Sequence, residues 1–111
     1  MNLKEEILKE HSNKQCNKIV EWVGTEKKKF NDLFHLFLQG EYRITQRAAW
    51  PLSYCAIAHP QFMKGNFEKL INNLNKPKLH DSIKRNSIRL LQSMDLPEEL
   101  EGDVWEFVLI I

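Results

Sequence analysis

The 111-residue sequence is poor in cysteine, glycine and long apolar runs. Its two cysteines, Cys16 and Cys55, are too few for a disulfide framework, which favours a cytoplasmic protein with free thiols. The four glycines are scattered singly, which excludes a phosphate-cradling glycine loop. No stretch approaches the roughly 20 apolar residues of a membrane span. Residues 1–6 carry acidic side chains and no apolar segment, so we expect neither a membrane association nor a secretory signal.

Charge is balanced overall but unevenly distributed. Residues 1–94 hold all 16 basic residues and nine of the acidic ones, whereas residues 95–111 hold the other six acidic residues. A basic body favours a polyanionic partner. Lysine-rich helix faces are also common on ordinary soluble proteins, so a solvated surface is the alternative.

The apolar residues recur with helical periodicity. Spacings of i, i+3, i+4 and i+7 predict amphipathic helices over residues 16–23, 30–38 and 67–74, with further helices over 3–11, 81–94 and 97–111. Residues 41–59 are apolar on most of the helix circumference, which is typical of a helix packed between neighbours. Pro51 predicts a kink in that helix, or a break into two helices. Sustained strand alternation and hairpin turns are absent from the sequence.

Three polar residues are predicted to begin helices. Ser12 is expected to be an N-cap, with Gln15 completing a capping box. Thr25 and Asn66 are expected to cap the helices that follow them.

The helices repeat as pairs. Residues 30–34 match residues 67–71 at a spacing of 37, and residues 46–52 match 84–90 at a spacing of 38. A period of this length with two helices per unit predicts an all-α fold, an α-α superhelix of about six antiparallel helices. In this alignment Arg47 and Arg85 are equivalent, and we expect them to form a polar ladder, with Glu41 or Asp81 as a carboxylate partner.

Residues 40–50, 53–60 and 79–86 resemble a family of small bacterial proteins with HEAT-like repeats. The helix-pair layout and residues 47–49 are also distantly similar to the HEAT-like DNA alkylation repair glycosylases. The resemblance implies a single HEAT/ARM-like solenoid domain over residues 1–111, acting as a non-enzymatic binding scaffold. The catalytic aromatic and acidic residues of the glycosylases cannot be placed on this sequence, so we do not expect glycosylase activity.

Some members of the small family carry an adenylosuccinate lyase label. Residues 84–86 match a tripeptide of that enzyme's signature loop, but here they lie in a predicted amphipathic helix of a much shorter chain. We therefore reject this activity.

Motifs for catalysis or metal binding are weak. Cys55 and His59 are spaced i, i+4, but two residues do not make a metal site. Cys55 lies among alanine and isoleucine, where a thiol has a raised pKa and little reactivity. We expect no catalytic residue, no metal and no cofactor.

The predicted binding surface is basic and flanked by aromatic residues. A protein partner is the first hypothesis, and a nucleic acid bound through its phosphates is the alternative. The candidate binding residues are Tyr42, Arg43, Arg47, Trp50, Lys84, Arg85 and Arg89.

The C-terminal residues 105–111 are almost entirely apolar. Terminal repeats need a polar outer face, so we expect this last helix to pack back on the body or to form a homodimer with a second copy. The alternative is that the chain is a piece of a longer solenoid.

Overall fold

The computed structural model describes residues 1–39, 41–76 and 81–92, and these residues form helices and connecting turns without a β-strand. The elements are α1 (Leu3–Lys9), α2 (Asn13–Val23), α3 (Lys27–Leu38), α4 (Tyr42–Ala58), the 3-10 helix η1 (Pro60–Met63), α5 (Phe67–Leu74) and α6 (Asp81–Gln92). The all-α prediction is confirmed. In the described part of the chain, no helix combines the length and apolar character needed to cross a membrane.

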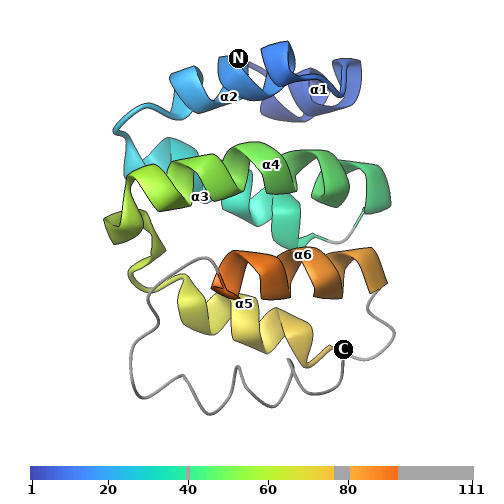
Figure 1. Cartoon of the computed structure of the whole chain (residues 1–111), viewed down its shortest axis with the longest axis vertical. Helices are drawn as coiled ribbons and strands as arrows, with labels where there is room; N and C mark the ends of the chain where they lie inside the picture. The colour runs from blue at the N-terminus through green and yellow to red at the C-terminus, as the bar shows by residue number, and fades with distance from the viewer. Residues whose placement is uncertain (40, 77–80, 93–111) are drawn as a thin grey trace.

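The helices are stacked as three successive pairs. Figure 1 shows α1 with α2 at one end, α3 with α4 in the middle and α5 with α6 below them. Helix α4 lies at the centre, since it contacts α1, α2, α3, η1 and α6. Stacked helix pairs whose neighbours share one apolar core are the architecture of an α-solenoid.

The first helices of the two later pairs repeat as predicted. The residues buried on α3 are Phe30, Leu33, Phe34 and Phe37, and a shift of 37 places Phe67, Leu70, Ile71 and Leu74 of α5 at the corresponding buried positions. Phe30 also packs against Phe62 of η1, with ring centroids 5.2 Å apart. Burying these large side chains supplies most of the packing free energy of a helical pair.

The second helices repeat with a different spacing from the one predicted. Ile44, Ala48, Pro51 and Leu52 are buried on α4, and the buried residues of α6 match them at a spacing of 39, as Ile83, Ser87, Leu90 and Leu91. The predicted spacing of 38 would place the exposed Arg89 opposite the buried Pro51. The equivalence of Arg47 and Arg85 is therefore wrong, because Arg85 corresponds to Gln46.

Two of these three predicted N-cap positions are confirmed, Ser12 and Asn66, but only Ser12 makes the side-chain hydrogen bond of a cap. The Ser12 hydroxyl accepts a hydrogen bond of 3.1 Å from the backbone N–H of Gln15. Thr25 lies one residue too early, since Glu26 is the N-cap of α3 and makes no side-chain cap bond. Asn66 is the N-cap residue of α5 as predicted, but its side-chain amide donates to the carbonyl oxygen of Phe62 and makes no side-chain cap bond.

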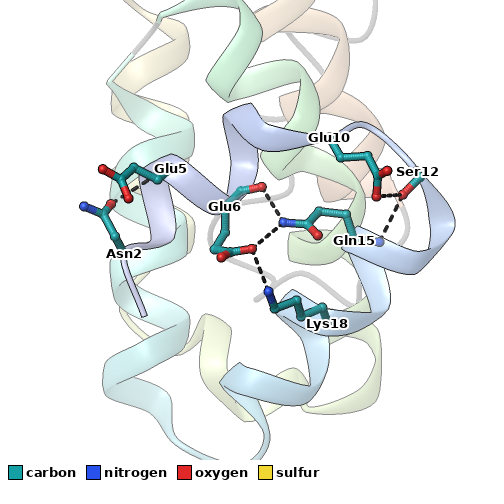
Figure 2. Close-up of polar contacts among 7 residues, drawn as sticks. All are labelled: Asn2, Glu5, Glu6, Glu10, Ser12, Gln15 and Lys18. Carbon is teal, nitrogen blue, oxygen red and sulfur yellow. Dashed lines mark hydrogen bonds and ion pairs between the residues drawn. The ribbon is translucent and has the colours of Figure 1, made fainter.

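The side chain of Gln15 joins α2 to α1 rather than completing a capping box. Figure 2 shows its amide donating to the backbone carbonyl oxygen and to the carboxylate of Glu6, which also pairs with Lys18 at 2.9 Å. Hydrogen bonds from Lys18 and Gln15 lower the pKa of the Glu6 carboxyl below its ordinary value of 4.5. This network fixes the short helix α1 against the stack.

Helix α4 continues through Pro51, so the predicted break into two helices does not occur. Its start is capped by Glu41, whose carboxylate accepts from the backbone N–H of Ile44 at 3.3 Å. The Thr45 hydroxyl is buried and donates to the carbonyl oxygen of Phe37 on α3 at 2.9 Å. These contacts fix α4 against its partner helix. The predicted helix over residues 97–111, and with it the homodimer, lies outside the described residues.

Candidate functional site

The exposed side of α4 is unusually apolar. Four of the six large apolar side chains that are exposed in the described part of the chain lie on this one helix. They are Tyr42, Trp50, Tyr54 and Ile57, with exposed fractions of 44%, 39%, 50% and 55%. Scattered exposed apolar residues are ordinary, but a group on one element marks an interaction surface.

Three of these residues share one side of the helix with an arginine. At about 100° per residue, Arg43, Trp50, Tyr54 and Ile57 fall within an arc of about 60°. We call these four residues the outer face of α4. The opposite side carries Ala48, Leu52 and Cys55, all buried in the core. The outer face is therefore basic toward its N-terminal end and apolar toward its C-terminal end.

A cleft lies beside this face, between α4 and α6. It has a volume of about 260 Å³ and is lined by Tyr42 and Gln46 of α4 and by Arg85, Asn86 and Arg89 of α6. We call it the arginine cleft. Among the described residues, its lining contains two guanidinium groups and no carboxylate. Such a set of side chains favours an anion.

Arg47, and the Trp50 ring at the edge of the outer face, contact the first helix pair. The Arg47 guanidinium donates to the carbonyl oxygens of Ile7 and Leu8 at 3.4 and 2.8 Å. The Trp50 ring packs edge-on against His11, with ring centroids 6.0 Å apart. The prediction of a carboxylate partner for Arg47 is wrong, because backbone carbonyls at the end of α1 take that place.

Five of the seven candidate binding residues therefore fall into two groups. Tyr42, Arg85 and Arg89 meet in the arginine cleft, while Arg43 and Trp50 lie on the outer face of α4. Lys84 is half-buried on α6 and does not line the cleft.

The sequence analysis missed Gln46 and Asn86 in the cleft and Tyr54 and Ile57 on the outer face. Ile57 lies in the range 41–59, whose apolar character on most of the helix circumference gave no sign of which residues are exposed. A repeat spacing of 39 would have identified Gln46, since it makes Gln46 equivalent to Arg85.

A second hollow lies on the first helix pair and has a volume of about 620 Å³. Its lining mixes both charges, because Lys9, Lys14 and Lys18 alternate with Glu10 and Glu21. Lys18 already pairs with Glu6. Mixed, paired charges are typical of a solvated surface, so we do not assign a ligand to it.

Two of the three lysines at the start of α3 have structural partners. Lys27 donates to the backbone carbonyl oxygen of Lys64 at 3.0 Å, and Lys29 pairs with Glu26 at 2.8 Å while lying 5.1 Å from the centre of the Trp22 ring. These contacts satisfy cations that the helix dipole disfavours.

The two thiols are buried and unreactive in character. Burial raises the pKa of Cys55 from 9.0 to about 11, and the nearby Cys16 makes a smaller contribution in the same direction. Burial also raises the pKa of Cys16. His59 caps the end of α4 and packs on Phe62, with centroids 4.9 Å apart. In the described ranges, no group of three or more His, Cys, Asp or Glu residues is arranged to hold a metal ion.

Comparison with known proteins gives one match. A model of the HEAT repeat domain matches residues 3–110. No curated protein and no solved structure matches the chain. The match spans nearly the whole sequence and agrees with the stacked helix pairs. The chain therefore belongs to the HEAT repeat family.

Proposed function

We propose that this protein is a non-enzymatic scaffold that binds a protein partner on the outer face of α4. One observation carries the proposal, which is the gathering of Trp50, Tyr54 and Ile57 in solvent on one helix. Tryptophan, tyrosine and arginine supply most binding free energy at protein interfaces, and Arg43 lies on the same side. HEAT repeats commonly serve as protein-interaction scaffolds, which supports the same role.

The position of α4 also supports this role. The helix is held from behind by α3 and on its flanks by α1, α2 and α6, so its outer face is presented on a rigid base. A partner that binds a rigid face loses less free energy to ordering than one that binds a loop.

The proposal is tested by photo-crosslinking in the cells that express the protein. A photoreactive phenylalanine replaces Tyr54 in one variant and Glu68, an exposed residue of α5, in the other. We expect a discrete adduct with one protein at position 54 and none at position 68. Trp50→Ala should remove the adduct. Equal labelling of many proteins at both positions would refute the proposal.

A second candidate is a nucleic-acid-binding role related to DNA alkylation repair. The arginine cleft favours it, since Arg85 and Arg89 could contact successive phosphates. Binding of this kind weakens steeply as salt rises. Arg85→Glu combined with Arg89→Glu should abolish it without unfolding the chain, because both side chains are exposed. If no oligonucleotide binds at low salt, this candidate is excluded.

A further inference from the structure

We propose that the arginine cleft binds acidic side chains of the partner, and that the partner binds through a segment with Asp or Glu at one end and apolar residues at the other. This inference rests on the proposed function and names the chemistry of the partner. The cleft receives the carboxylates, and the outer face of α4 receives the apolar side chains.

The lining of the cleft is rich in hydrogen-bond donors. Arg85 and Arg89 contribute guanidinium groups, while Gln46 and Asn86 contribute side-chain amides. The ion pairs among the described residues join Lys18 to Glu6 and Lys29 to Glu26, and neither involves an arginine. Asp81 lies one turn before Arg85 on α6 without forming an ion pair with it. Among the described residues these two guanidinium groups have no ion-pair partner, and such groups on one wall can bind carboxylates bidentately.

The spacing of the donors suits an extended or helical segment rather than a small molecule. Arg85 and Arg89 are one turn apart on α6, and Gln46 of α4 lines the same cleft, so donors lie on both walls. The volume of about 260 Å³ lies below the usual range of small-molecule pockets, about 300–1,000 Å³. The cleft therefore fits one or two side chains of a macromolecule.

The distance along α4 sets the pattern in the partner. Gln46 and Ile57 are eleven residues apart, which is about 16 Å at the rise of an α-helix. Acidic and apolar groups in the partner must be separated by a similar distance. A helix of about three turns or an extended stretch of about five residues spans it.

The uneven charge of the surface favours such a peptide over a nucleic acid. A phosphate backbone carries charge along its whole length and needs basic residues throughout its path. Toward the C-terminal end of the outer face, the exposed groups are Tyr54 and Ile57, which offer no positive charge. A peptide that is acidic at one end and apolar at the other matches both the arginine cleft and the apolar end of the outer face.

The experiment selects ligands for the full chain from a displayed library of random 16-residue peptides. The selected peptide is then labelled with fluorescein, and its dissociation constant is measured by anisotropy. The variant Arg85→Gln/Arg89→Gln removes the guanidinium groups of the cleft. The matched control Lys14→Gln/Lys69→Gln removes the same charge from exposed positions on α2 and α5. A phosphoserine version of the peptide and a single-stranded oligonucleotide are measured in parallel.

We expect the selected peptides to combine acidic and apolar residues, and the cleft variant to bind the labelled peptide about tenfold or more weakly. The control variant should stay within about twofold. Replacing the peptide's acidic residues by Gln or Asn should weaken binding to the original chain but not to the cleft variant.

Three results would overturn the inference. They are selected peptides without acidic residues, equal losses in both variants, and an oligonucleotide or phosphopeptide that binds through the cleft more tightly than the acidic peptide. An adduct at position 54 that survives Arg85→Gln/Arg89→Gln unchanged would overturn the inference but leave the proposed function standing. Absence of any adduct at position 54 would overturn the proposed function itself.

Discussion

The guanidinium of Arg47 donates a hydrogen bond of 2.8 Å to the carbonyl oxygen of Leu8, which lies 39 residues earlier in the chain. A second bond reaches the carbonyl oxygen of Ile7. The last carbonyls of a helix lack partners within it and carry the negative end of its dipole, so a cation placed there stabilises the helix. Arg47 thereby ties the central helix α4 to the end of α1.

The first prediction concerns this contact. Arg47→Met keeps much of the apolar stem and removes the charged donors, and we expect it to lower the free energy of unfolding by about 1–2 kcal/mol. Urea unfolding followed by circular dichroism measures the change. Arg43→Met on the exposed side of α4 is the control and should change stability by less than about 0.5 kcal/mol. Equal effects of the two substitutions would contradict the capping role.

The second prediction concerns two buried polar side chains of the third pair. Asn73 and Ser87 are buried, and their side chains have no hydrogen-bond partner in the part of the chain that the structure describes. The repeat places Leu36 and Ala48 at the corresponding positions of the preceding pair. Ser87→Ala and Asn73→Leu should therefore each raise the free energy of unfolding by about 1 kcal/mol. A loss of stability in Ser87→Ala would show that its hydroxyl has a partner.

The third prediction concerns the pH dependence of stability. The pKa of Cys55 is about 11 in the folded chain and 9.0 when unperturbed, so the unfolded chain releases this proton first. The stabilising contribution of the neutral thiol is complete below pH 9.0 and is lost as the pH rises toward about 11. Under reducing conditions, urea unfolding of Cys55→Ala should show a smaller drop in stability between these pH values than the unmodified chain. Identical drops in the free energy of unfolding for the two chains would contradict this role of the Cys55 thiol.

The helical fold was predictable from the sequence because apolar periodicity is local. Phe30 and Phe67 begin the same apolar pattern on two helices, and burial confirms their spacing of 37. The spacing of 39 between α4 and α6 was not predictable from the sequence. Residues 41–59 are apolar around nearly the whole helix, so the pattern does not indicate which side faces the core. Burial against the core decides which side of such a helix is inside.

The candidate site was predictable in part. A run of basic and aromatic residues indicated α4 and α6, and Tyr42, Arg85 and Arg89 do meet in one cleft. Arg47 instead binds the carbonyl oxygens at the end of α1. No local sequence pattern predicts that the end of α1 lies beside α4. The exposure of Ile57 depends equally on which helices surround α4.

The most direct test of the account is the affinity of the partner captured at position 54. Its dissociation constant is measured for the unmodified chain, for Trp50→Ala and for Leu8→Ala, which truncates an exposed apolar side chain of α1 and keeps the carbonyl that Arg47 contacts. The account predicts a loss of about tenfold or more for Trp50→Ala and little change for Leu8→Ala, with both variants folded. Unchanged affinity in Trp50→Ala, or equal losses in the two variants, would contradict the assignment of the outer face of α4 as the binding surface.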